Sequence, residues 1–157
     1  MSAMETKTIR LEHPLAQGAE VAEKETWTFP AGLIGLPAYR AFALLTLEAA
    51  PPFRLLASLD DPTFGLVLVD PGALVPEYEL ALEEADLAAL DIPATEKLEV
   101  LVPVVLPRGN VPLSLNLKGP LVFAAGVWRG GQVVSRNENH SVRFEPDLGG
   151  RGAECSS

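Results

Sequence analysis

Prolines and glycines interrupt this chain along its whole length, and their spacing limits how long any helix or strand can become. The 157 residues include 14 prolines and 13 glycines, which are spread through the chain instead of being gathered in one linker. Proline cannot donate a backbone hydrogen bond and glycine favours turns, so both residues tend to end regular structure. Many short elements joined by tight turns are typical of an all-β architecture.

Short apolar runs of strand length fill the intervals between these turns. They occupy residues 21–29, 42–47, 53–59, 64–69, 78–82, 98–106, 113–117, 120–125 and 142–144. Residues 83–90 are the best helix candidate, because acids in a first helical turn interact favourably with the helix dipole. The regular spacing of the short strands predicts a mainly β fold, namely a small, partly closed antiparallel β-barrel with one or two short helices.

Two local features refine this prediction. Pro103 removes a ladder donor from the strand at residues 98–106, so this strand should lie at a sheet edge or carry a bulge. An exposed edge there would be a place for a partner to bind. The segment 129–132 contains Gly130 and Gly131 and is predicted to turn the chain into its next strand.

The chain is long enough for one domain, and we predict that residues 1–148 form it. Residues 149–157 are small and polar, so we expect a disordered C-terminal tail. The single cysteine, Cys155, lies in that segment without a partner, which argues against disulfides and cysteine metal sites. No apolar stretch approaches the ~20 residues that span a bilayer, and the start lacks a signal-peptide pattern. We therefore expect a cytoplasmic protein.

The negative charge of the chain is concentrated in its middle third. The formal net charge is −9, and residues 55–99 hold eleven acidic residues against one base, Lys97. A surface of one sign attracts a partner of the opposite sign and speeds its encounter. We therefore predict a basic protein partner and no direct binding of nucleic acid, which is itself a polyanion. The alternative is that the acids only solvate loops and keep the protein soluble.

The predicted partner-binding residues are an acidic rim and two further side chains. Tyr78 is the candidate aromatic anchor, and half-buried core is its alternative role. Asn116 either presents its amide at a loop mouth or satisfies local backbone groups. The rim consists of Asp60, Asp61, Asp70, Glu77 and Glu79.

Patterns for catalysis and metal binding are weak. The only histidines, His13 and His140, lie far apart and match no zinc spacing, and His140 is predicted to be a hydrogen-bonded turn residue. Asp60, Asp61 and Asp70 could lie close together, which keeps a small-molecule-binding β-barrel or an acid-dependent hydrolase as the alternative function. Adjacent acids before proline are ordinary turn residues. The main prediction is therefore a non-enzymatic protein without cofactor or metal.

An ordered series of short motifs resembles one known family. The series covers residues 27–134, and its order and spacing are more specific than any single piece. The motifs are Phe29-Pro30-x-Gly32-Leu33-x-Gly35 with Tyr39 and Phe42, Pro52-Phe53, Leu56-x-Ser58-x-Asp60-Asp61-Pro62, Leu68-Val69-Asp70-Pro71, Pro76-x-Tyr78-Glu79, the strand at 98–105, and Leu113-x-x-Asn116-Leu117-x-x-Pro120-Leu121-Val122. On these motifs the chain resembles the flagellar assembly factors of the FliW family.

The resemblance implies a small cytoplasmic β-barrel-like protein without catalytic activity, which binds flagellin and the translational regulator CsrA. In the family's scheme the free protein binds CsrA, an RNA-binding protein, and relieves its repression of flagellin mRNA. Accumulated flagellin then captures the protein and restores repression. A regulator that binds RNA is expected to be basic, which fits the acidic surface of residues 55–99. We expect the free protein to be monomeric and to have no membrane partner.

Overall fold

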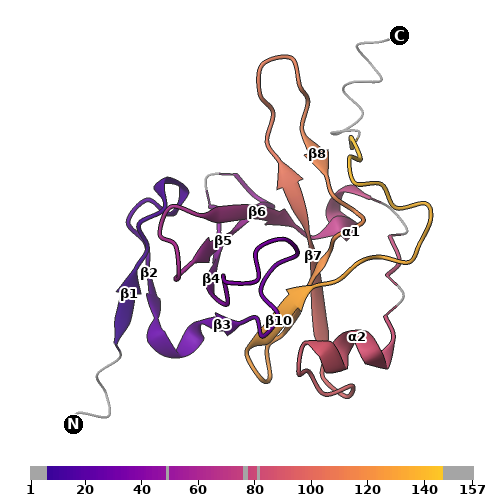
Figure 1. Ribbon diagram of the computed structural model, residues 1–157. Coiled ribbons are helices and arrows are strands. Elements are labelled where there is room, and N and C mark those ends of the chain that lie inside the picture. The colour runs from indigo at the N-terminus through magenta and orange to yellow at the C-terminus, as the bar shows by residue number, and fades with distance from the viewer. Residues whose placement is uncertain (1–6, 49, 76–77, 81, 147–157) are drawn as a thin grey trace.

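The computed structural model describes residues 7–48, 50–75, 78–80 and 82–146 (Figure 1). Within these residues the chain forms ten strands, two short α-helices and two 3-10 turns. The strands are β1 Thr8–Arg10, β2 Glu20–Ala22, β3 Trp27–Thr28, β4 Ala41–Thr46, β5 Arg54–Ser58, β6 Gly65–Val69, β7 Leu98–Val105, β8 Ser114–Leu115, β9 Leu121–Ala124 and β10 Arg129–Gln132. The helices are α1 Pro71–Leu74 and α2 Glu84–Ala89, and the 3-10 turns are Pro14–Ala16 and Glu23–Glu25.

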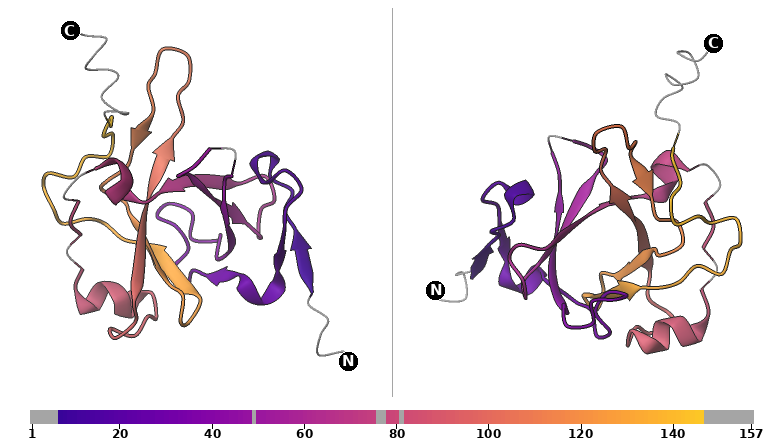
Figure 2. Two further views of the ribbon diagram at one scale, coloured as in Figure 1. Left: turned by 180° about the vertical axis from the view of Figure 1, so that it is seen from behind. Right: turned by 45° about the horizontal axis from the view of Figure 1, so that its top comes forward.

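Seven of the described strands close into a barrel. Their order is β6-β5-β4-β3-β10-β9-β7, and β6 pairs back onto β7 through Leu68–Pro103 and Val69–Val102. The right-hand view of Figure 2 shows these strands tracing a ring. Neighbours in the ring are antiparallel except β3 and β10, which run parallel. The predicted mainly β barrel with short helices is confirmed. The ring is closed, although β6 and β7 pair through only two residue pairs, so a stretch of each strand keeps an unpaired edge.

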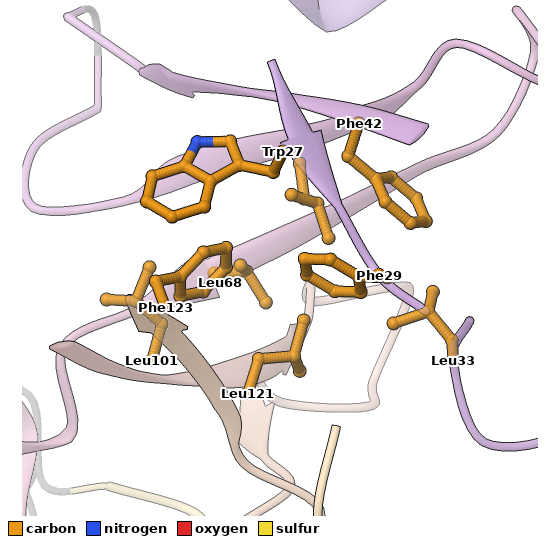
Figure 3. Packing of buried hydrophobic residues seen from close by; sticks show 9 residues of the cluster. Trp27, Phe29, Leu33, Phe42, Leu68, Leu101, Leu121 and Phe123 are labelled. Atoms are coloured by element: carbon orange, nitrogen blue, oxygen red, sulfur yellow. The ribbon is translucent and has the colours of Figure 1, made fainter. Parts of the chain in front are cut away.

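Aromatic and leucine side chains fill the interior of the barrel (Figure 3). Phe29, Phe42 and Phe123 are buried there together with Leu68 and Leu101. The ring centroid of Phe29 lies 4.8 Å from that of Phe42 and 5.7 Å from that of Phe123. Successive side chains of a strand point to opposite faces, so one apolar set lines the interior while the other set faces outward.

Two parts of the chain cover the outward-facing apolar side chains. The helices and their flanking segments cover those near β7 and β9, and the N-terminal segment with Leu11 and Ala16 covers those of β4 and β5. Figure 1 shows α1 and α2 on the same side of the barrel as β7. Leu87 of α2 and Leu90, the residue that caps its C-terminus, pack against Val122 and Val133. The predicted helix at residues 83–90 is confirmed in this element. Its start is fixed because the Asp86 carboxylate accepts a hydrogen bond from the backbone N–H of Glu83 at 2.9 Å.

Pro103 does not lie at an edge, so that part of its prediction is wrong. It is buried inside β7. This strand pairs with β9 through Leu98–Leu101, with β6 through Val102 and Pro103, and with β8 through its last two residues. The partners β9 and β8 are thus interrupted opposite Pro103, and only its carbonyl is used, as the acceptor for the Asn116 N–H at 2.9 Å. A proline fits where the ladder is interrupted like this, because it has no N–H to donate.

Several segments differ from the predicted secondary structure. Residues 142–144 form no strand, since only Phe144 makes an isolated bridge, to Leu115, and the 3-10 turn Glu23–Glu25 interrupts the predicted strand at 21–29. Arg129–Gln132 is the strand β10 and not a turn. Its glycines are required by packing, because a Cβ on Gly130 would lie 2.6 Å from the Val122 carbonyl oxygen and 2.8 Å from the Phe29 ring. Among residues 78–82, the described ones form no strand. They run as an extended cover over the outer face of the barrel, where Tyr78 packs on apolar side chains.

Candidate functional site

The acidic rim expected from the sequence divides into two groups at opposite ends of β6. Asp60 and Asp61 lie in the turn before the strand, and Asp70 follows its last residue. A strand of 5 residues spans roughly 16 Å. Asp70 therefore does not join Asp60 and Asp61, and the carboxylate cluster on which the hydrolase alternative depended is not formed.

Asp60 and Asp61 hold the fold together at their end of β6. One oxygen of Asp60, Oδ2, accepts hydrogen bonds from the backbone N–H groups of Arg40 at 2.8 Å and Ala41 at 2.9 Å. Asp61 accepts a 2.6 Å bond from the Tyr39 hydroxyl and two bonds from Thr63. The bond from Tyr39, followed by those from Thr63, lowers the pKa of Asp61. These carboxylates tie the segment before β4 to the turn before β6.

The second group surrounds a groove of about 480 Å³ beside α1. Asp70 and Tyr78 line it together with Glu99, which sequence reasoning did not single out. Asp70 is exposed and accepts a bond from the Gly72 N–H at 2.8 Å as the N-cap of α1. Glu79 is exposed next to Tyr78, and Glu77 lies outside the described residues. The other lining residues are Pro71, Gly72, Leu80, Leu98 and Val100.

Glu99 is partly neutralised by a cation from the neighbouring part of the barrel. Its Oε2 lies 2.8 Å from Arg54 Nη1, and both side chains are partly exposed. Arg54 stands in β5 opposite Leu68 of β6, whose side chain lies in the barrel core. No local sequence motif predicts this ion pair, because its members are 45 positions apart in the chain. Asp70 is therefore the lining acid that is not in an ion pair within the described residues, and the exposed Glu79 follows Tyr78 directly in the chain.

Tyr78 forms one wall of the groove and is also part of the packed structure. Its ring stacks on His140 with centroids 4.4 Å apart and an interplanar angle of 8°. Its hydroxyl donates a long hydrogen bond of 3.4 Å to the Leu117 carbonyl. Burial raises the pKa of Tyr78 to about 12. Tyr78 therefore has the half-buried packing role that the sequence left as the alternative, and because it also lines the groove, its role as an anchor stays a prediction.

Behind Tyr78 lies a small polar cluster that the sequence revealed only in part. His140 Nδ1 lies 2.5 Å from the Oγ of Ser135, a buried residue that also accepts a bond from the Asn137 N–H. The prediction of a hydrogen-bonded turn histidine is confirmed. Burial, followed by the charge of Lys118, lowers the pKa of His140. The neutral imidazole is thus favoured, and it supports the Tyr78 ring.

Asn116 serves the local backbone and not a loop mouth. Its Oδ1 accepts hydrogen bonds from the N–H groups of Lys118 and Gly119, each at 3.0 Å. This is the backbone-capping role that the sequence left as the alternative. The asparagine therefore shapes the loop between β8 and β9, which closes on the Tyr78–His140 stack.

Two further properties of the described residues bear on the kind of site. Within the described ranges, no group of three or more histidine, cysteine or carboxylate side chains could hold a metal ion. None of the helices in those ranges is long and apolar enough to cross a membrane. The fold and the groove thus define a small closed β-barrel with an acidic groove, one wall of which is a packed aromatic ring.

Comparisons with known proteins show which family this barrel resembles. The family model described as "FliW protein" matches residues 10–146. A flagellar assembly factor FliW from Clostridium botulinum is 30% identical over 124 residues, which are 79% of this chain and 88% of the relative. One from Leptospira interrogans is 32% identical over 126 residues, covering 79% and 83%.

A solved structure agrees with these sequence matches. The crystal structure of a flagellar assembly factor FliW superposes with a TM-score of 0.76 at 28% identity, and the match covers 88% of this chain and 96% of that chain. The chain belongs to the FliW family of flagellar assembly factors. The resemblance that the sequence motifs suggested is confirmed.

Proposed function

We propose that this protein is a non-enzymatic binding protein that takes part in flagellar assembly by associating with flagellin and with a CsrA-type translational regulator. The observation that supports this most is the acidic groove, which is lined by the exposed carboxylate of Asp70 together with the ring of Tyr78. Aromatic anchors surrounded by polar groups dominate many protein interfaces. An RNA-binding regulator is basic where it meets RNA, and an acidic groove is complementary to it.

The proposed cycle is an exchange of partners. Free protein, monomeric and cytoplasmic, binds the regulator and keeps it from repressing the translation of flagellin mRNA. When flagellin accumulates, it captures the protein and releases the regulator. Charge accounts for the attraction between protein and regulator, since the net charge of −9 and the acids at the groove favour encounter with a basic surface. The apolar part of the groove, from Tyr78 to Val100, then holds the partner.

Titration calorimetry tests the proposal directly. The purified protein is titrated with the CsrA-type regulator and with flagellin of the same organism, each at low and moderate salt. We expect tight binding to the regulator that weakens with salt and disappears when flagellin is saturating. Asp70→Lys should weaken regulator binding, whereas Glu138→Lys, an exposed charge reversal outside the groove lining, should have little effect. Absence of binding by both folded partners would contradict the proposed function.

A further inference from the structure

A second groove opens where β6 and β7 separate. The two strands pair only at Leu68–Pro103 and Val69–Val102. Beyond Leu68, β6 extends back to Gly65, and beyond Pro103, β7 continues to Val105. A groove of about 490 Å³ lies between these two stretches, and we call it the wedge. The wedge shares no lining residue with the acidic groove.

The wedge is lined mainly by apolar side chains, several of which are strongly exposed. Leu66, Val67 and Val104 form its walls. Val105 is 54% exposed, Leu106 is 45% exposed and Val111 is 43% exposed. These last three belong to the hairpin between β7 and β8, which Figure 1 shows rising away from the barrel. Contiguous exposed apolar surface of this kind marks interaction sites in soluble proteins.

The hairpin keeps its shape through its own turn. The N–H and C=O groups of Arg108 and Val111 exchange hydrogen bonds of 3.0 and 2.9 Å around Gly109, whose φ is +59°. Pro107 and Pro112 flank this turn and have no N–H to donate. The hairpin therefore stays extended beyond the barrel, and Val105 and Val111 remain uncovered.

The polar side chains of the wedge are hydrogen-bond donors. His13 Nδ1 accepts a 3.1 Å bond from the Leu15 N–H, so the proton of the neutral ring is on Nε2. That edge of the ring lies on β6, because a Cβ on Gly65 would be 2.7 Å from Nε2. Arg108 forms no ion pair with the described residues. No acidic side chain lines the wedge.

We propose that the wedge binds an extended segment of a partner protein in which apolar side chains stand next to a carboxylate. The segment would add as a strand between β6 and β7, where the two strands continue but no longer pair with each other. Its apolar side chains would cover Val105 and Leu106. Its carboxylate would meet Arg108 and His13 Nε2. In a chain of net charge −9, this is a groove whose charge complementarity favours an acidic ligand. The inference goes beyond the proposed function.

The test uses two short blocked peptides and the nitrogen-labelled protein. In both peptides valine alternates with threonine, and the last residue is glutamate in one and lysine in the other. We expect the glutamate peptide to cause saturable amide shifts at residues 65–67 and 104–106 in heteronuclear NMR spectra. The lysine peptide should bind about fivefold more weakly, as for an exposed ion pair. Absence of saturable shifts at millimolar peptide, or shifts centred elsewhere, would overturn the proposal.

Matched variants separate the wedge from general effects. Arg108→Glu should reverse the preference between the two peptides, and Val105→Asp should reduce binding of the glutamate peptide at least fivefold. Val142→Asp is the control, because Val142 is 66% exposed but does not line the wedge. Asp70→Lys should leave peptide binding unchanged. A negative result for the wedge is therefore distinct from a negative result for partner binding at the acidic groove. Equal effects of the Val105 and Val142 variants on peptide binding would overturn the proposal. Amide shifts that depend on protein concentration, showing a second copy of the protein in the wedge, would also overturn it.

Discussion

The two ends of β6 carry the same kind of residue and use it in different ways. Before the strand, Asp61 and its neighbour accept hydrogen bonds from Tyr39 and from the start of β4. After the strand, Asp70 accepts one bond from Gly72 and stays exposed beside Tyr78 at the groove. The first end is closed by donors from a distant segment, whereas the second end is left open.

This difference teaches that the position of an acid in the chain does not decide its role. A hydrogen-bonded carboxylate still adds to the long-range electrostatic field of the protein, because the lowered pKa of Asp61 keeps this side chain ionised. Only carboxylates without a full set of internal donors can make close contacts with a partner. The donors available at each end of β6 therefore separate a structural acid from a candidate binding acid.

The largest effect is expected from Asp60→Ala. It leaves the N–H groups of Arg40 and Ala41 without their acceptor, which should lower the free energy of unfolding by about 1–3 kcal/mol. Asp70→Ala removes a single helix cap and should cost about 1 kcal/mol or less. Urea denaturation of both variants measures the contrast. Asp60→Asn keeps an oxygen acceptor and is the control. Equal losses of stability for the two alanine variants would contradict the distinction between the two ends of β6.

The next effect is kinetic and belongs to the other end. Asp70→Lys combined with Glu79→Lys should slow association with a CsrA-type regulator about tenfold at low salt and flatten its salt dependence. Stopped-flow measurements at several salt concentrations check this. Glu23→Lys with Glu25→Lys makes the same change in net charge on an exposed 3-10 turn. If that control slows association equally, net charge and not the groove controls the encounter.

Acid titration sharpens the comparison at the closed end. Hydrogen bonds from Tyr39 and then from Thr63 hold the pKa of Asp61 below its ordinary value in the folded protein, so its ionised form stabilises the fold. That contribution is fully present above the unfolded pKa, about 3.9, and is lost as the pH falls through the folded pKa. Asp61→Asn should therefore make stability less dependent on pH below about 4. Thermal melts across this acid range measure it, and an unchanged slope would contradict the assignment.

The sequence was sufficient for the class of fold because barrel strands repeat a local pattern. Alternation and turn residues predicted most of the strands, and acids followed by leucines predicted α2. β10 was missed because two adjacent glycines normally indicate a turn. Here the same glycines make room for Phe29 and Leu90, which come from segments far away in the chain.

The candidate site was predictable only where its members are neighbours in the chain. Asp70 and Tyr78 were found because acids, prolines and an aromatic residue cluster there. The partners that decide each role were not, since Tyr39 is 22 positions from Asp61 and His140 approaches Tyr78 only in the folded chain. Hydrogen-bond donors brought by folding leave no local signal, so the closed end of β6 could not be told from the open end.

The smallest effect separates the two tyrosines that face the two ends. Tyr78→Phe loses a hydroxyl whose bond to Leu117 is 3.4 Å long, so stability should change by about 0.5 kcal/mol or less. The ring and its stack on His140 remain, so affinity for a partner at the groove should stay within about twofold. Tyr39→Phe removes the 2.6 Å bond to Asp61 and should lower the melting temperature more. A large loss of affinity in Tyr78→Phe would show that the hydroxyl, and not the ring, contacts the partner. The centre of the groove would then bind its partner through polar contacts.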